Sequence, residues 1–388
     1  MLHTYAILLL SLAVLYAATL LLLGRGLRKL PPGRNRAKLL VSVVIAARNE
    51  EHNIQTCLQH VLQQDYPSEK LEVIVVDDRS EDNTAAMVAE FARQDPRVTL
   101  LRIRDVSGDL APKKRAIDTG VRHATGEIIL TTDADCTPGP GWVAEMVRHF
   151  EPRVGMVAGY NPYETARASV FHRMLALDYF AMAAVAAASA GLGYPISCTG
   201  GNLAYRREVY FESGGLQHLG AWISGDDDLF LEQVRDKTDW QIRYAVNAAS
   251  FVPTQPPGNI AEFVQQRIRY ASKGRHYKWN VTVALILIYV MNFCLVFGPL
   301  AALFQPVLLA PWLGALFLKW IVEFSFLQQA KVIFRATFSK SDFVLTALIH
   351  PLYIVLAGLA GQVAGFQWKG ESYRAKLRPQ LQAQPDDL

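Results

Sequence analysis

Residues 126–136 read GEIILTTDADC, an apolar run that leads directly into two acidic residues. A short run rich in isoleucine and threonine is typical of a buried strand. Asp133 and Asp135 then follow the carboxyl end of that strand, one residue apart. Two like charges in this position are unfavourable unless a cation lies between them, so the pattern predicts a divalent metal site for Mg²⁺ or Mn²⁺.

Similar runs recur between residues 39 and 160. They read VSVVIAA, LEVIVVDD, VTLLRI and VGMVAG, and segments with helical periodicity separate them at 51–64, 82–93, 113–123 and 140–150. This alternation predicts an α/β fold with a mostly parallel, Rossmann-like sheet and helices on both faces. Such sheets bind ligands at the carboxyl ends of their strands. The candidate ligand-binding residues at that edge are Asp77, Asp78, Asp133 and Asp135.

Long apolar stretches indicate an integral membrane protein. Residues 5–23, 281–304, 306–327 and 343–366 each approach the ~20 residues that cross a bilayer. The first could be a cleaved signal peptide, but MLHTY lacks Lys and Arg and no small-x-small cleavage site follows. The basic residues after this stretch place the middle region in the cytoplasm by the positive-inside rule. We therefore expect a multi-pass protein of the inner (cytoplasmic) membrane.

Two apolar regions leave alternatives open. Residues 166–192 are Ala-rich and short for a span, so they form either a buried helix or a membrane-surface helix. Four spans would leave the carboxy-terminal tail outside, whereas its basic residues favour the cytoplasm. Those residues are Lys369, Arg374, Lys376 and Arg378. Either a later segment does not cross or the tail breaks the rule.

Composition narrows the class of partner. The net charge is +4, and the basic excess lies beside the apolar segments, which favours anionic lipid over nucleic acid. The four cysteines have no pairing or metal-type spacing and fit a reducing compartment. Residues 260–279 combine an apolar face with basic side chains, which predicts an interfacial helix leading into the membrane.

Five motifs in order make the chain resemble family-2 glycosyltransferases of the GT-A fold, which are inverting and nucleotide-sugar dependent, fused to membrane helices. The motifs are VVDDRSEDNT (75–84), APKKRAIDTG (111–120), DAD (133–135), CTGGNLAYRREV (198–209) with SGDDDLFLEQV (224–234), and VQQRIRYASKG (264–274). The implied plan is an amino-terminal transmembrane anchor, a cytoplasmic GT-A domain, an amphipathic interfacial helix, about three transmembrane helices and a polar tail. Their boundaries are 1–30, 36–256, 257–280, 281–368 and 369–388.

The resemblance implies a donor site in the first two motifs. Asp77 and Asp78 would hold the base and ribose of a UDP-sugar, and their structural alternative is turn and cap formation. Ala46 and Glu50 belong to the neighbouring strand edge. Lys113 would meet the diphosphate or the donor sugar, since a cation at a helix N-terminus is otherwise poorly placed.

The third and fourth motifs carry the implied chemistry. Asp135 would hold the metal, and Asp133 the metal together with the sugar or ribose. An inverting transfer also needs a general base for the acceptor hydroxyl. We expect Asp227 in that role, then Asp226 and then Asp228. An acidic helix N-terminus is the alternative for one or two of the three.

The implied acceptor site combines a loop with the interfacial helix. The loop contributes Thr199, Gly200, Gly201 and Asn202, and the helix contributes Gln266, Arg269 and Tyr270. Tyr270 stands where the family signature Q-x-x-R-W has Trp. An ordinary basic amphipathic helix is the alternative for this last motif.

The overall plan is similar to that of ceramide glucosyltransferases and their bacterial relatives, which implies transfer of one sugar to a membrane lipid. A polysaccharide synthase of the same family is the alternative, although such enzymes usually carry more spans. A transporter is a remote alternative, because Lys319 and Glu323 are four residues apart and can neutralise one another, leaving His350 as the other ionisable candidate.

Overall fold

A seven-stranded sheet forms the centre of the larger domain. This computed structural model describes residues 2–105, 110–164, 169–220, 225–272, 278–363, 366–368 and 371–373. The strand order is β3-β2-β1-β4-β6-β5-β7. Only β6 runs antiparallel to its neighbours, which confirms the predicted α/β class. The strands are β1 (Val41–Ala47), β2 (Leu71–Asp78), β3 (Val98–Ile103), β4 (Ile128–Asp133), β5 (Val154–Ala158), β6 (Leu203–Arg206) and β7 (Gln241–Tyr244).

Helices cover both faces of this sheet, so its strands carry apolar residues at successive positions. Val43 and Ile45 of β1 pack in one core with α2 and α5. Val44, which points to the opposite face, packs in a second core with α4 and α6. The helices of this domain are α2 (Ile54–Leu62), α3 (Thr84–Gln94), α4 (Pro112–His123), α5 (Trp142–Val147), α6 (Val170–Gly191), α7 (Arg207–Glu212) and α8 (Asp228–Lys237).

The strand register brings the predicted acidic residues to one edge. β1 pairs with β2 and with β4, and Ala47 lies opposite Asp77 while Ala46 lies opposite Asp133. The carboxyl ends of these three parallel strands therefore meet at the same height. Glu50, which follows β1, reaches the same edge.

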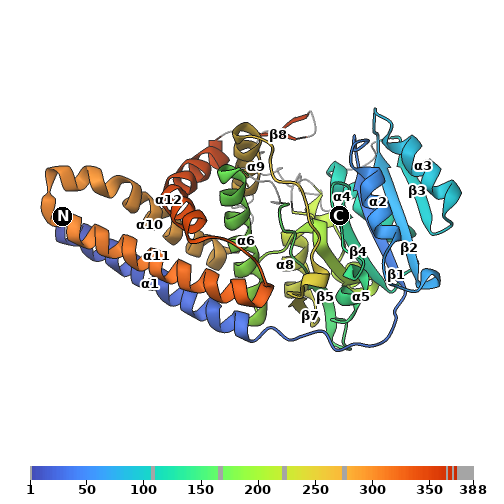
Figure 1. Cartoon of the computed structure of the whole chain (residues 1–388), viewed down its shortest axis with the longest axis horizontal. Coiled ribbons are helices and arrows are strands. Elements are labelled where there is room, and N and C mark those ends of the chain that lie inside the picture. Colours follow the sequence, from blue (N-terminus) through green and yellow to red (C-terminus); the bar gives the residue numbers. More distant parts are fainter. Residues whose placement is uncertain are drawn as a thin grey trace, which may run out of the picture.

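Among the residues that the structure describes, five helices are long and apolar enough to cross a membrane, which indicates a membrane protein. They are α1 (Leu2–Arg28), α6, α10 (Trp279–Phe304), α11 (Leu309–Phe334) and α12 (Lys340–Val363). Figure 1 shows α1, α10 and α11 projecting away from the sheet toward the end where the N-terminus lies. Helices α6, α12 and α9 (Ile260–Ser272) lie between that bundle and the sheet. A short hairpin of β8 (Phe366–Trp368) and β9 (Glu371–Tyr373) follows α12.

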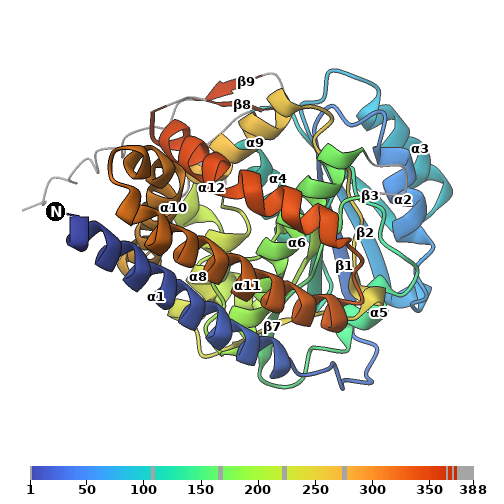
Figure 2. The same cartoon turned by 60° about the vertical axis from the view of Figure 1, so that its left-hand side comes forward.

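Helices α1 and α11 run side by side (Figure 2). The Tyr16 hydroxyl donates to Glu323, and Gln329 donates to the carbonyl oxygen of Gly24. The Lys319 Nζ atom lies 2.7 Å from Glu323 Oε1. This contact confirms the predicted mutual neutralisation of Lys319 and Glu323 within the apolar bundle.

Helix α6 joins the sheet to the membrane helices. It packs against β7 on one side and against α1 and α12 on the other. At its crossing with α1, a Cβ atom on Gly191 would lie 2.1 Å from the carbonyl oxygen of Gly26, so glycine is required for this close approach. Most residues in the apolar stretch of α6 are buried inside the protein. This burial agrees with the prediction of a buried helix in this region.

Candidate active site

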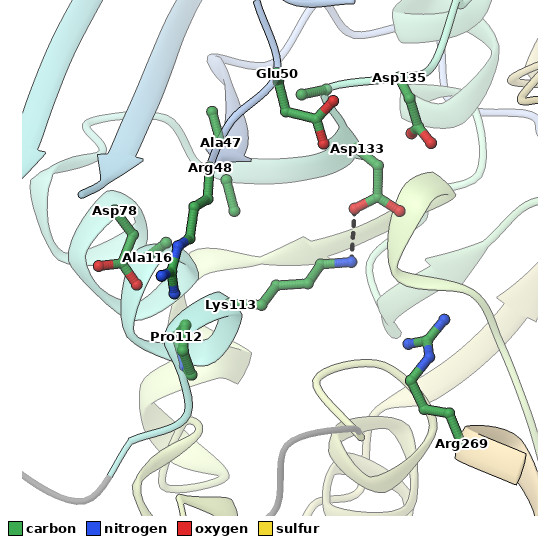
Figure 3. A pocket seen from close by; sticks show the side chains of 12 residues that line it. Ala47, Arg48, Glu50, Asp78, Pro112, Lys113, Ala116, Asp133, Asp135 and Arg269 are labelled. Carbon is green, nitrogen blue, oxygen red and sulfur yellow. Dashed lines mark ion pairs between the residues drawn. The ribbon is translucent and has the colours of Figure 1, made fainter. Parts of the chain in front are cut away.

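A cavity opens at the carboxyl edge of β1, β2 and β4 (Figure 3). We call it the donor cavity, because it contains most residues predicted to bind the donor. Its polar lining comes from five separate segments of the chain. The parallel register brings together the three that follow β1, β2 and β4, and α4 and α9 supply the other two. The charged lining residues are Arg48, Glu50, Asp78, Lys113, Asp133, Asp135 and Arg269, and the small ones include Ala46 and Ala116.

Lys113 is the central cation of this cavity. Its Nζ atom lies 2.6 Å from Asp133 Oδ1 and 3.3 Å from Asp226 Oδ2. Burial alone would lower the pKa of Lys113, but the two carboxylates outweigh burial and raise the pKa. The side chain therefore stays protonated, and its charge at the helix N-terminus is balanced by carboxylates that a phosphate could replace.

Three carboxylates beside Lys113 are of the type that suits a divalent cation. Figure 3 shows Glu50, Asp133 and Asp135 around the same part of the cavity. Carboxylate oxygens are the ligands that Mg²⁺ and Mn²⁺ prefer. Among the described residues, no three His, Cys, Asp or Glu side chains are grouped closely enough to hold a metal ion. Asp133 and Asp135 are the residues that would hold a divalent cation together with oxygens of a bound diphosphate.

Two buried thiols lie behind this acidic pair. Cys57 donates to the backbone oxygen of Asp133, and the Cys136 sulfur lies 3.8 Å from an Asp135 oxygen. Burial and the neighbouring carboxylates raise the pKa of both thiols. Both side chains are therefore neutral thiols in this environment.

Asp77 and Asp78 differ in their surroundings. Asp78 lines the donor cavity, and both of its oxygens accept from the Arg115 guanidinium at 3.0 and 2.7 Å. The Asp77 side chain is buried and its Oδ1 accepts the backbone N–H of Ser80. The contacts of Asp77 are those of the turn alternative, whereas Asp78 keeps access to the cavity.

The three consecutive aspartates also separate by environment. Asp227 is the N-cap of α8: its Oδ1 accepts the N–H of Asp228 at 2.7 Å, and its Oδ2 that of Gly200 at 3.3 Å. Asp228 accepts from the N–H of Leu229 and is buried. Asp226 accepts no hydrogen bond at its buried Oδ2, which instead faces the ammonium of Lys113.

Two glycines let the acceptor loop approach these acids. A Cβ atom on Gly200 would lie 2.9 Å from Asp226 Oδ2, and one on Gly201 would lie 3.0 Å from Asp133 Oδ2. Thr199 donates from its hydroxyl to Asn161 Oδ1 at 2.5 Å. Side chains larger than glycine at positions 200 and 201 would push the loop away from the carboxylates.

Asn202 does not fit the predicted acceptor role. Its side chain is fully buried, its Oδ1 accepts from the Trp142 indole, and its Nδ2 donates to the carbonyl oxygens of Tyr160 and Ser250. These bonds use its amide inside the protein. Asn202 therefore fixes the loop on the sheet, and we correct its assignment from acceptor binding to support of the loop.

A second cavity, here called the acceptor cavity, adjoins the first. The two share Lys113, Asp133, Asp135 and Arg269. The acceptor cavity is also lined by all three aspartates of the 226–228 motif and by Thr199, Gly200, Gly201, Gln266 and Tyr270. The fifth motif is thus at the cavity as predicted, although Gln266 contacts Tyr163 and Arg269 lies over the ring of Tyr270.

Sequence reasoning missed one wall of the acceptor cavity. Tyr179, Met182, Ala183 and Ala186 of α6 line it, together with Tyr163. The rings of Tyr163 and Tyr179 are stacked, with centroids 4.5 Å apart. An Ala-rich run gives no chemical signal of a binding surface, and only the packing of α6 reveals it. Arg48 was also missed, and the ordinary loop following β1 gave no signal for it.

The mostly parallel sheet with acidic residues at its carboxyl edge is the arrangement of the GT-A fold, and comparison with known proteins agrees. The profile described as Glycosyl transferase family group 2 matches residues 128–360, well over half of the 388 residues. The profile described as Glycosyl transferase family 2 matches residues 42–212. The chain belongs to glycosyltransferase family 2.

Individual relatives share part of the chain. A poly-beta-1,6-N-acetyl-D-glucosamine synthase of Staphylococcus epidermidis is 26% identical over 242 residues, which are 60% of this chain and 54% of that protein. The probable glycosyltransferase YdaM of Bacillus subtilis is 27% identical over 261 residues, covering 64% of this chain and 59% of that protein. The chain thus spans about half the length of these curated relatives.

One solved structure is similar over nearly the whole chain. A mannosyltransferase of Pyrobaculum calidifontis, solved in complex with GDP-Man and Mn²⁺, superposes with a TM-score of 0.59 at 21% sequence identity. The similarity covers 93% of this chain and 99% of that one. At this identity the likeness shows a common fold, which includes the GT-A domain.

Proposed function

We propose that the protein transfers one sugar from a nucleotide sugar, such as a UDP-sugar, to a lipid acceptor in the membrane, with inversion at the anomeric carbon. The carrying observation is the pair of adjoining cavities that share Lys113 and Asp133. The acceptor cavity extends to α6 and α9, which pack against the helices of the membrane bundle. A lipid headgroup entering from the membrane surface would therefore meet the donor at the shared residues.

The donor cavity supplies a group for each part of a nucleoside diphosphate sugar. Ala46, Glu50 and Asp78 border the end where the nucleoside would lie. Lys113 and Arg269, both cationic and both shared between the cavities, would contact the diphosphate. Bound Mg²⁺ or Mn²⁺ would neutralise charge on the departing nucleoside diphosphate.

Asp226 is the general base that the contacts favour. The two oxygens of Asp227, ranked first from the sequence, accept backbone N–H groups, and such bonds lower the basicity of a carboxylate. Asp226 lines the acceptor cavity and its Oδ2 accepts no hydrogen bond. When a phosphate occupies Lys113, the Asp226 carboxylate is released to take the proton of the acceptor hydroxyl.

The acceptor headgroup would lie between the loop and α9. The backbone at Gly200 and Gly201 approaches the acids, and Gln266 with Tyr270 lies across the cavity. The stacked Tyr163 and Tyr179 rings offer an aromatic face, which suits the apolar side of a sugar ring or the start of a lipid chain. The catalytic domain would accordingly lie on the cytoplasmic side of the inner membrane.

A polysaccharide synthase is the second candidate, and the observation in its favour is the similarity to the staphylococcal poly-beta-1,6-N-acetyl-D-glucosamine synthase. That enzyme's name specifies a polymeric product. The similarity covers 60% of this chain, so the acceptor has to be tested directly.

Mass spectrometry of lipid extracts tests both candidates. The purified full-length protein would be incubated with membrane lipids and a panel of UDP-sugars and GDP-sugars, since the similar mannosyltransferase binds GDP-Man. We expect one lipid species to gain the mass of a single sugar. A ladder of products separated by one sugar mass would instead establish the polysaccharide synthase, and hydrolysis of every donor without a glycosylated product would refute both.

A further inference from the structure

Helix α12 begins and ends on the same side of the membrane bundle. Its start follows the end of α11, where Lys331 Nζ donates to the Phe338 carbonyl oxygen and Arg173 of α6 pairs with Asp342 at 3.0 Å. Its other end lies against α9, since a Cβ atom on Gly361 would lie 2.4 Å from that of Ala271. Arg173 and Ala271 both belong to helices beside the catalytic domain.

If α12 crossed the membrane, its end would lie near the turn between α10 and α11. Helices α10 and α11 form a hairpin whose turn, residues 305–308, lies at the end far from the sheet (Figure 1). With 24 residues, α12 is ~36 Å long, enough to reach that turn if it ran along α11. In Figure 1, α12 instead stays beside α6 and α9. Tyr289, in the first half of α10, contacts Val355 and Gly358 near the end of α12.

Polar contacts attach the middle of α12 to the catalytic side. The Tyr353 hydroxyl donates to Asp178 of α6 at 2.7 Å, and Arg267 of α9 pairs with the other oxygen of Asp178 at 2.7 Å. Phe263 of α9 packs edge to face on Tyr353. Positions 263 and 271 of α9 thus meet positions 353 and 361 of α12, so the two helices run parallel and adjacent.

The opposite face of α12 is apolar and exposed. Leu345, Leu348, Leu352, Leu356 and Leu359 recur every three or four residues and are 38 to 57% exposed. An exposed apolar stripe of this kind suits contact with lipid hydrocarbon, and the positions of the two helix ends, rather than the stripe, distinguish a helix in the leaflet from a crossing one. Helix α9 beside it also exposes Ile260 and Val264.

We propose that α12 lies in the leaflet on the catalytic side, with its leucine stripe in the lipid hydrocarbon, and that only α1, α10 and α11 cross the membrane. The partner that contacts the leucine stripe is thus the lipid bilayer. Three crossings return the chain to the catalytic side after α11. The tail residues Lys369, Arg374, Lys376 and Arg378, which lie outside the described residues, then obey the positive-inside rule.

Accessibility of single cysteines in the full-length protein tests the side of the tail. Gln382→Cys reports the tail, Arg93→Cys on exposed α3 reports the catalytic side, and Gln305→Cys reports the α10–α11 turn. The unaltered protein is the background control, because its four cysteines are buried. In sealed vesicles of each orientation, an impermeant maleimide should label positions 382 and 93 from the same side. Labelling of position 382 together with position 305 would overturn the proposal.

Spin labels on the leucine stripe test the orientation of α12 independently. In the reconstituted protein, cysteines replacing Leu345, Leu352 and Leu359 would carry a nitroxide, and its depth is read from collisions with oxygen and a water-soluble nickel complex. An in-plane helix gives similar depths at all three positions. A crossing helix puts position 352 up to ~10 Å deeper than the other two, because seven residues rise that far. That second pattern would refute the proposal.

Discussion

Asp226→Asn should stop turnover while leaving both the fold and donor binding nearly intact. The substitution keeps the shape of the side chain and removes its negative charge. Lys113 loses the partner at 3.3 Å but keeps Asp133 at 2.6 Å, so no buried cation is left unpaired. Loss of a general base lowers turnover by roughly 10²–10⁴-fold, which corresponds to about 3–5 kcal/mol in the activation free energy.

Asp227→Ala provides the matched control, because the neighbouring side chain is an N-cap. Removal of a cap costs about 0.5–2 kcal/mol of stability. We therefore expect a thermal midpoint lowered by a few degrees and activity that is largely retained at low temperature. The two variants should therefore differ in both properties: Asp226→Asn should be stable and inactive, whereas Asp227→Ala should be active and less stable.

The assay combines turnover, nucleotide affinity and thermal unfolding for the same detergent-purified samples. For Asp226→Asn, we expect an unchanged dissociation constant for the nucleotide and a strongly reduced kcat. If Asp227→Asn, which keeps a capping side chain, is the inactive variant and Asp226→Asn turns over normally, the base is Asp227. If Asp226→Asn, Asp227→Asn and Asp228→Asn all turn over normally, the 226–228 motif has no role in proton transfer and the proposed general-base mechanism is wrong.

Three other perturbations probe the metal, a buried histidine and the α6–α9 contact. Chelation should abolish turnover and added Mn²⁺ or Mg²⁺ should restore it, because Asp133 and Asp135 lie where diphosphate charge develops; full turnover in chelator would exclude this. Burial lowers the pKa of His149 to about 4, below its unfolded value, so its contribution to stability is complete above pH ~6.5 and is lost as pH falls toward 4. The free energy of unfolding of His149→Leu, measured by thermal unfolding, should accordingly vary with pH by about 3 kcal/mol less than that of the unaltered protein. A pH profile identical to that of the unaltered protein would contradict this assignment. Arg267→Leu should destabilise the protein by about 3–5 kcal/mol, since it removes the ion-pair partner of the buried Asp178 carboxylate, which keeps the hydrogen bond from Tyr353. The added change Asp178→Leu should recover much of that loss, and equal midpoints for the single and double variants would argue against this reasoning.

The sheet and its functional edge could be predicted because both depend on local pattern. Apolar runs of strand length alternate with amphipathic segments, and this spacing leaves few alternatives to parallel pairing. Once β1, β2 and β4 are parallel neighbours, the residues after each strand must share an edge. Asp78, Lys113 and Asp133 therefore line one cavity as expected.

The roles of individual carboxylates could not be predicted because they depend on contacts between distant segments. Asp78 is paired with Arg115, a residue 37 positions later that gave no local signal. Which of Asp226 and Asp227 is the N-cap and which is the proposed base depends on the residue at which α8 begins. A shift of that start by one residue would exchange the two roles. Helix boundaries are the part of a sequence pattern that local propensity defines least.

Helix α6 lines the cavity in which we propose that the acceptor binds and also packs against membrane helices, so we propose that the predicted boundary at residue 256 does not separate two parts that fold independently. One face of α6 lines the acceptor cavity through Met182 and Ala183, and the helix also packs against α1 and α12. A fragment covering 36–256 would retain α6 but lose both helices that cover it, which would expose the closely packed surface at Gly191. The wall of the acceptor cavity is therefore stable only where the membrane helices are present. This packing explains why the motifs located the loop and the α9 side of the acceptor cavity but not its remaining wall: that wall belongs to an Ala-rich helix whose position depends on its packing against the membrane helices.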